Sequence, residues 1–336
     1  MVKRWLAGLW LVGLLVPAAP FLSQAQAEET VTIQLVKSTG QAPFYIAIGK
    51  GYFEKEGIHV DSGNVRSALD TIAPMATGRL DGSMGAATAG FFNAAHQGFD
   101  MRIVAVMGIQ GHLMATQALV RKDLWDNGTI KSAKDYRGRK IAINAPGDIT
   151  EYFLTKMLGK YGMTLKDVNE TSMEFALQVV AFKNSAIDAG FLPEPLATTA
   201  KSQGEAVLDQ PEQSIGEGIP TTFLFLATKF MQDRPKVALA FMRALIRGAR
   251  DAQGDFSKNP DVAAMIAKQT DLKLADVENS APYVFDPNLD ITKFEGKLRD
   301  EETVHRANGR LNYTEPLSFD KVIDAKLVHQ AAAQVK

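Results

Sequence analysis

The chain has 336 residues, with 37 basic and 38 acidic side chains and no cysteine. The formal net charge of −1 argues against nucleic acid as a partner. The lack of cysteine excludes disulfides, thiol catalysis and thiolate metal sites. A chain of this length can bury a sizeable core, most simply as two domains.

Residues 1–27 have the layout of a signal peptide. Lys3 and Arg4 precede a short apolar run, and Ala25-Gln26-Ala27 supplies the small residues of a cleavage site. The alternative is a membrane anchor, but a spanning helix needs about 20 apolar residues, more than this run offers. We predict export, cleavage after Ala27 and a free, soluble mature chain in the periplasm.

The first predicted unit is a strand, a polar loop, a helix and a second strand. Residues 31–36 alternate in polarity as a strand does, and the loop after them ends at Pro43. Residues 44–48 form an apolar helix, and residues 58–60 form the next strand. In such units, small ligands bind at the loop that follows the carboxyl end of the strand.

The chain then continues as alternating helices and strands. We predict helices over 66–77 and 88–97, and strands over 102–107 and 117–120, with a flexible loop at 108–112. Between the two helices, a short strand that starts near Leu80 runs into a loop of small residues.

A second round of the same elements begins at Tyr136. It comprises a strand at 141–143, a loop at 144–148, helices at 149–160 and 176–182, and a strand at 187–191. The two rounds share a short motif, Leu80-Asp81-Gly82 in the first and Ile187-Asp188-Ala189 in the second. This repetition predicts an α/β fold with two similar domains, whose mostly parallel sheets are covered by helices.

The last third of the chain is predicted to be mainly helical. An apolar strand at 223–227 is interpreted as the return crossing between the domains, beside an outward crossing near 117–120. Helices follow at 235–250, from Pro260 onward and at 319–334. We therefore expect domain 1 to comprise residues 28–117 and 223–336, and domain 2 to comprise residues 118–222.

The sequence carries no strong catalytic or metal-binding motif. It lacks a phosphate-binding loop, a Gly-x-Ser-x-Gly nucleophile turn and a His-Glu-x-x-His motif, and its five histidines are not at ligand spacing. Asp81 and Asp188 could be read as paired catalytic carboxylates, but capping of nearby backbone donors is the better interpretation. We predict no enzymatic activity and no cofactor.

Several small or polar loops follow predicted strands, and most of them open a helix. Helix starts present free N–H groups and a partial positive charge, so they can hold an anion without a lysine. Arg66 could face the ligand or form a surface salt bridge, and His112 could contact the ligand or lie on the surface. Phe44 could add apolar contact or pack in the core.

Four stretches of the sequence carry a resemblance to a known family. They are Gly40–Val60, Ala76-Thr77-Gly78-Arg79-Leu80-Asp81-Gly82, Tyr136–Ala142 with Pro146-Gly147, and Asn184–Ala189 with Glu194-Pro195. In this order they resemble the solute-binding proteins of ABC importers for sulfonates, nitrate and taurine, a group whose fold is shared with thiamine-pyrimidine synthases.

The resemblance implies a type II periplasmic binding protein fold with a two-strand hinge and a ligand in the interdomain cleft. It also implies a monomer that delivers its ligand to an ABC permease driven by a cytoplasmic ATPase. The implied ligand-binding positions are Ser38, Gln41, Pro43, Ser67, Ala87, Thr88, Gly111, Asp148, Thr150 and Glu194.

The ligand itself is not determined by the resemblance. A small organic anion, such as a sulfonate or an aromatic carboxylate, is the first expectation, and a neutral or cationic heterocycle paired with Glu194 is the alternative. The chain could thus be a pyrimidine-precursor binding protein. A thiamine-pyrimidine-synthase-like enzyme is a further alternative, but such enzymes carry a cysteine-rich motif that is absent here. A subunit that signals to a membrane sensor also fits the sequence.

Overall fold

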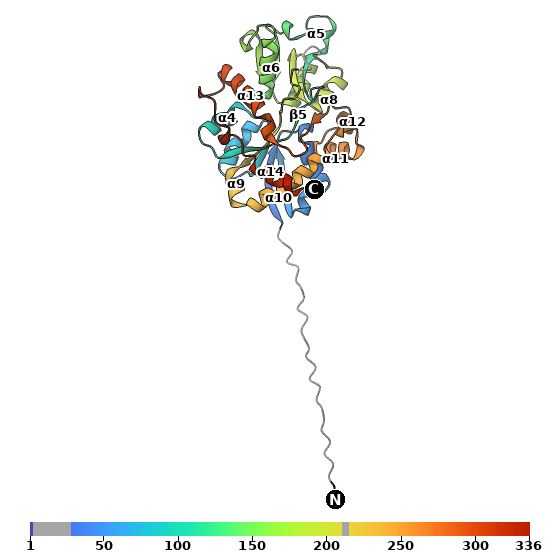
Figure 1. The fold of residues 1–336 in the computed structure, drawn as a ribbon. Helices are drawn as coiled ribbons and strands as arrows, with labels where there is room; N and C mark the ends of the chain where they lie inside the picture. Colours follow the sequence, from blue (N-terminus) through green and yellow to red (C-terminus); the bar gives the residue numbers. More distant parts are fainter. Residues whose placement is uncertain (3–27, 210–214) are drawn as a thin grey trace.

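The computed structural model describes residues 1–2, 28–209 and 215–336, so the predicted signal peptide and its cleavage site lie almost entirely outside the described residues. Two five-stranded sheets, each covered by helices, form the two halves of the molecule (Figure 1). Among the described residues, no helix combines the length and the apolar character needed to cross a bilayer.

The first sheet has the strand order β2-β1-β3-β11-β4. Its strand β11 runs antiparallel to both of its neighbours, so the other four strands run parallel to one another. The strands are β1 (Glu29–Leu35), β2 (Ile58–Asn64), β3 (Gly82–Gly85), β4 (Met101–Val106) and β11 (Phe223–Ala227).

The second sheet repeats this arrangement with the order β8-β7-β9-β6-β10. Here β6 is the antiparallel strand, in the position that β11 takes in the first sheet. The strands are β6 (Thr116–Arg121), β7 (Lys140–Ile143), β8 (Asn169–Ser172), β9 (Ala189–Pro193) and β10 (Ala206–Leu208). The equivalence confirms both the predicted repetition and the mostly parallel sheets.

Helices cover both sheets, and two further helices bridge the halves by packing against a helix of each. The helices of the first half are α1 (Ala42–Gly49), α2 (Tyr52–Lys55), α3 (Ile72–Ala76), α4 (Ala89–His96), α9 (Thr228–Asp233), α10 (Pro235–Asp251), α11 (Pro260–Thr270) and α14 (Lys326–Gln334). Those of the second half are α5 (Lys122–Asp126), α6 (Ile149–Gly159), α7 (Phe175–Lys183) and α8 (Leu196–Ser202). The bridging helices are α12 (Leu274–Glu278), between α8 and α11, and α13 (Glu295–Ala307), between α4 and α6.

Three predicted elements differ from the structure. The loop expected at 108–112 contains the short strand β5 (Ile109–Gln110), which pairs with β12 (Tyr283–Val284). The helix expected over 66–77 is divided into a 3-10 turn, η2 (Ala68–Thr71), and α3. The helix expected over 319–334 becomes regular only in α14, because the preceding residues bridge to β4 at Ile103.

The predicted path between the halves is wrong. Strand β11 lies between β3 and β4 in the first sheet, whereas β6 belongs to the second sheet, so the two strands are not neighbours. The chain segments that pair between the halves are 108–110 and 218–222, where the N–H of Gln110 donates to the carbonyl of Ile219 at 2.9 Å. An apolar strand such as β11 is buried on both faces, which favours the middle of a sheet over a crossing.

Each half has its own apolar core. In the first, Phe53 stacks on Phe241 with ring centroids 5.0 Å apart, where α10 covers α1 and α2. Close packing of α1 on α10 depends on Gly248, because a Cβ there would lie 2.0 Å from the carbonyl oxygen of Pro43. In the second, Phe153 of α6 packs in a separate cluster over β6, β7 and β9.

Candidate ligand-binding site

A cavity lined by polar and apolar residues lies where loops of both halves meet at the carboxyl ends of β1, β3, β7 and β9. In this arrangement of the halves its volume is about 40 Å³, well below the roughly 300–1,000 Å³ of typical small-molecule pockets. It is lined by Val36, Ser38, Gln41, Ser67, Ala68, Gly85, Ala86, Thr116, Asn144, Asp148, Ile149, Phe175, Pro193, Thr221, Thr222 and Tyr283.

Two loops of the first half supply hydroxyl and amide groups to the cavity. After β1, Ser38 begins the turn η1 (Thr39–Gln41); its hydroxyl accepts the N–H of Gly40 at 3.1 Å and donates to Oε1 of Gln41 at 2.7 Å. After β2, Ser67 begins η2, and its hydroxyl accepts the N–H of Leu69 at 3.2 Å. The free donors at these helix starts are thus partly satisfied by the protein's own side chains.

The second half supplies two acceptor groups, Asn144 and Asp148. Asp148 caps α6: its Oδ1 accepts the N–H of Thr150 at 2.9 Å and the hydroxyl of Thr150 at 2.6 Å. Burial raises the pKa of Asp148 above its ordinary value. Asn144 donates from Nδ2 to the carbonyl of Arg66 at 3.3 Å, while its buried Oδ1 has no hydrogen-bond partner among the described residues.

The remaining polar wall comes from the segments between the halves. The hydroxyls of Tyr283 and Thr116 lie 3.0 Å apart, and Thr221 and Thr222 stand beside them. Burial raises the pKa of Tyr283, so it is a neutral hydroxyl at physiological pH. Sequence reasoning missed all four residues, because they follow no motif and come together only when β6, β12 and the 218–222 segment meet.

The charge of the cavity differs from that of an anion site. Among its lining residues in the described part of the chain, Asp148 is the only carboxyl group, and there is no lysine, arginine or histidine. The helix starts at Ser38, Ser67 and Asp148 are capped by their own side chains. The wall therefore offers neutral hydroxyl and amide groups and one carboxyl, which suit hydrogen-bond donors on a neutral or cationic ligand.

The structure brings only some of the predicted site residues together. Ser38, Gln41, Ser67 and Asp148 line the cavity, and Thr150 lies directly behind Asp148. Six of the predicted residues are placed elsewhere: Pro43 lies at the α1–α10 contact, Phe44 and Ala87 are in the core, Thr88 caps α4, Gly111 packs near Pro282 and Val284, and His112 is exposed near Glu217.

The two charged candidates Arg66 and Glu194 also lie outside this lining. Arg66 is exposed, 3.7 Å from Asp70, and lines an outer cavity that shares Val36 and Phe175 with the inner one. Glu194 is fully buried, and burial raises its pKa. Its carboxylate accepts hydrogen bonds from Gln117 Nε2 at 2.7 Å and from the backbone N–H groups of Thr198 at 2.9 Å and Ala281 at 3.1 Å. Glu194 thus connects β6, α8 and the segment before β12 through hydrogen bonds.

The repeated aspartates are structural, as predicted. Asp81 accepts the N–H of Thr32 at 2.9 Å, and Asp188 accepts the N–H of Lys140 at 3.0 Å, so each caps the neighbouring strand. Each also pairs with an arginine, Asp81 with Arg234 and Asp188 with Arg121.

Solved structures share this fold. The periplasmic nitrate-binding protein NrtA from Synechocystis PCC 6803 superposes with a TM-score of 0.73 at 18% identity, covering 91% of this chain and 89% of NrtA. The alkanesulfonate-binding protein SsuA from Xanthomonas axonopodis pv. citri, bound to MOPS, gives a TM-score of 0.69 at 17% identity, covering 91% and 99%. The fold is therefore that of type II periplasmic binding proteins, as the sequence predicted.

The chain belongs to the NMT1/THI5-like family, whose model matches residues 38–261. Its similarity to curated proteins is moderate. The riboflavin-binding protein RibY from Chloroflexus aurantiacus is 25% identical over 268 residues, which are 75% of this chain and 68% of RibY.

Proposed function

We propose that this protein is an extracytoplasmic solute-binding protein that captures a small molecule between its two halves. A single observation carries the proposal: neutral polar groups from both sheets converge on one cavity at the carboxyl ends of the strands. The binding proteins of the same fold support it. The loaded protein, in the periplasm after removal of its leader, delivers the solute to an ABC permease driven by a cytoplasmic ATPase.

The ligand class favoured by the cavity is a neutral or cationic nitrogen heterocycle. Asn144 Oδ1, which has no partner in the described part of the chain, and the Asp148 carboxyl group can both accept hydrogen bonds, so they match ring N–H or amino groups. A small anion would place its charge near the buried Asp148 without a cationic side chain in the lining. The similarity to a riboflavin-binding protein supports the heterocycle over the anion that the sequence first suggested.

A thermal-shift panel on the mature chain from Glu28 tests both parts of the proposal. The panel includes riboflavin, aminopyrimidines, alkanesulfonates, taurine, nitrate and benzoate. A ligand at one hundred times its dissociation constant adds about 2.7 kcal/mol to the free energy of unfolding, so we expect one heterocycle class to raise the melting temperature selectively.

The other outcomes are equally informative. A selective shift with an anion overturns the heterocycle and leaves solute binding in place. No shift, together with no copurified small molecule in denaturing mass spectrometry, overturns solute binding. Formation of a new pyrimidine during incubation, detected by mass spectrometry, would favour the synthase-like enzyme.

A further inference from the structure

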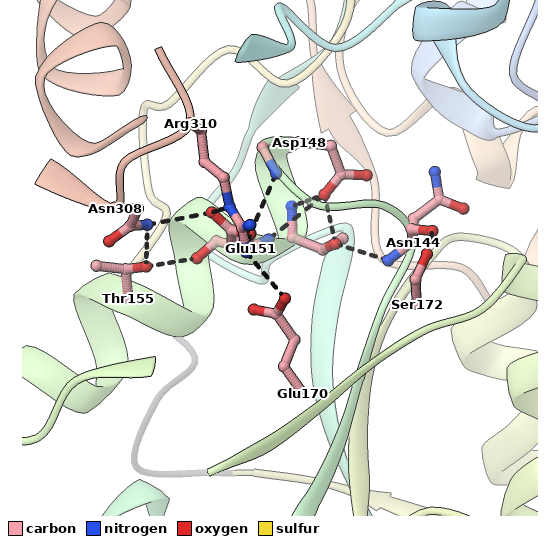
Figure 2. A network of polar contacts seen from close by, with 10 residues as sticks. Asn144, Asp148, Glu151, Thr155, Glu170, Ser172, Asn308 and Arg310 are labelled. Carbon is pink, nitrogen blue, oxygen red and sulfur yellow. Dashed lines mark hydrogen bonds and ion pairs between the residues drawn. The ribbon is translucent and has the colours of Figure 1, made fainter. Parts of the chain in front are cut away.

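An arginine outside the cavity connects the two halves of the molecule. Arg310 follows α13, and Figure 2 shows its side chain pointing at two carboxylates of the second half. Its Nε donates to Oε2 of Glu151 at 2.9 Å, and its Nη2 lies 2.6 Å from the same oxygen and 3.1 Å from Oε1 of Glu170. Glu151 belongs to the first turn of α6, and Glu170 belongs to β8.

The backbone of Arg310 is fixed to the first half. Its carbonyl accepts a hydrogen bond from Nδ2 of Asn93 in α4 at 3.0 Å, and the N–H of Asn312 donates to Oδ1 of the same Asn93 at 2.9 Å. Helix α4 is anchored to the first sheet, where Phe91 packs edge-on against Phe225 of β11 with centroids 4.8 Å apart. The arginine therefore joins the first half through its backbone and the second through its guanidinium.

The carboxylate that Arg310 holds is connected to the cavity wall. Oε2 of Glu151, which is labelled in Figure 2, accepts the N–H of Gly147 at 3.2 Å. The carbonyl of Gly147 in turn accepts the N–H of Ala89 in α4 at 2.7 Å. Gly147 has a φ of +69°, and a Cβ there would lie 2.6 Å from the Cβ of Ala89. Residues 144–151 thus form one segment, held from both sides, that presents Asn144 and Asp148 to the cavity.

The ion pair between Arg310 and Glu151 also matters electrostatically, because the carboxylate of Glu151 is buried. The side chain of Glu151 is fully buried, and its other oxygen accepts a hydrogen bond from Nδ2 of Asn308 at 3.2 Å. A buried carboxylate is stable only while its donors and its counter-charge are in place. Separation of the halves would withdraw Arg310 and Asn308 from Glu151 together, so this arrangement of the halves is favoured by the ion pair.

We propose that Arg310 is a positioning residue that latches the two halves together and, through Glu151, holds the 144–151 segment in its ligand-binding geometry. The link to ligand rests on the proposed function, but the latch itself is tested on the unliganded protein. Loss of the arginine is expected to widen the separation of the halves and to loosen the 144–151 segment.

Distance measurements by electron paramagnetic resonance test the latch. Because the chain has no native cysteine, spin labels can be placed at Lys166→Cys in the second half and at Lys236→Cys in the first, both exposed positions. We expect Arg310→Met to shift the distance distribution to longer values, and Arg310→Lys to retain part of the short population.

Arg234→Met is the matched control. Arg234 is 31% exposed, close to the 33% of Arg310, and it pairs with Asp81 within the first half. This variant should leave the distances unchanged.

Hydrogen exchange gives the second readout. The amides of residues 144–151 should exchange about tenfold faster or more in Arg310→Met, since truncating one partner of a buried charge pair is costly. Their exchange in Arg234→Met should match that of the wild type.

The outcomes separate the latch from the proposed function. Wild-type distances and exchange in Arg310→Met, or equal changes in Arg234→Met, overturn the latch whatever the thermal-shift panel shows. If Arg310→Met does not fold, Glu151→Gln removes the buried charge instead and should lengthen the same distances; unchanged distances in that variant overturn the proposal.

Discussion

At the scale of single residues, Asp148 combines a structural role with a position on the cavity wall. It caps α6 and also supplies the only carboxyl group of the described lining. Burial raises its pKa, so the folded protein holds this proton more tightly than the unfolded chain does. Ionisation of Asp148 therefore lowers the free energy of unfolding as pH rises from the ordinary carboxyl range through the raised pKa.

The variant Asp148→Asn isolates this effect. Asparagine keeps the cap but cannot ionise, so the variant should gain stability relative to wild type as pH rises from about 4 towards 7. Each unit by which the pKa is raised corresponds to about 1.4 kcal/mol. Denaturant unfolding at several pH values measures the difference, in which distant carboxyl groups cancel, whereas the charge of Asp148 also acts on the pKa of Glu170 and of Glu301. A difference independent of pH would contradict the prediction.

The same variant should bind the proposed ligand less well. Replacing the carboxyl group removes a hydrogen-bond acceptor, and a hydrogen bond contributes about 0.5–1.5 kcal/mol, so affinity should fall up to about tenfold. Isothermal titration with the ligand found in the thermal-shift panel measures it. Unchanged affinity would show that the ligand does not contact Asp148, and Glu217→Gln on the exposed surface serves as the control.

Glu194 was predicted to contact the ligand, but the structure surrounds its carboxylate with hydrogen-bond donors of the protein. Its carboxylate is used by Gln117, Thr198 and Ala281 and does not line the cavity. Glu194→Gln presents an NH₂ group to some of these donors, so we expect a loss of about 2–3 kcal/mol in the free energy of unfolding. Ligand affinity of the folded variant should change little. A stable variant with a large loss of affinity would restore the predicted ligand contact.

At the scale of elements, the contact of α1 with α10 fixes the loop that begins the site. Helix α1 follows Ser38 and Gln41 directly, and Gly248 lets α10 approach the carbonyl of Pro43. The amphipathic pattern of residues 235–250 predicted α10 well. The pattern did not indicate which glycine the packing requires.

Gly248→Ala should destabilise the protein although alanine favours helices. The gain in helix propensity is about 1 kcal/mol, but the added Cβ would lie 2.0 Å from backbone, so we expect a net loss of about 1–3 kcal/mol. Gly296→Ala in α13 is the control, because nothing lies within 4 Å of its Cβ, and it should be neutral or stabilising. Chemical denaturation compares the two. A stabilised Gly248→Ala would mean that the helices can separate at little cost.

At the scale of the whole molecule, the two halves meet at the cavity, at the paired segments 108–110 and 218–222, at the bridging helices α12 and α13, and at Arg310. A ligand that contacts both halves can favour the closed arrangement only through its higher affinity for that arrangement. This is the hinge closure that we propose for the capture of solute.

Small-angle scattering should detect this closure. The radius of gyration of the mature protein should fall when the ligand identified by the thermal-shift panel is added, and it should rise in unliganded Arg310→Met relative to wild type. A ligand analogue that binds without any change in the radius would argue against closure. Taurine, if inactive in the panel, provides the control for the added solute.

The local pattern of the sequence determined much of this fold. Alternating polarity and glycine or proline boundaries located most strands and helices, and the repeated Asp81 and Asp188 motifs indicated two similar halves. Ser38, Gln41 and Asp148, which the family resemblance implied, line the cavity from loops that the strand pattern located after β1 and β7. The polar helix α13 was missed, since its charged residues give little apolar periodicity.

Only the tertiary structure decided which distant groups meet. Thr116, Thr221 and Tyr283 share a wall, and Arg310 reaches Glu151 across 159 positions of sequence. Backbone propensity and periodicity are local properties, so they determine elements and the loops between them. The charge of the cavity, the burial of Glu194 and the path between the halves depend on how the two sheets pack, which no local pattern encodes.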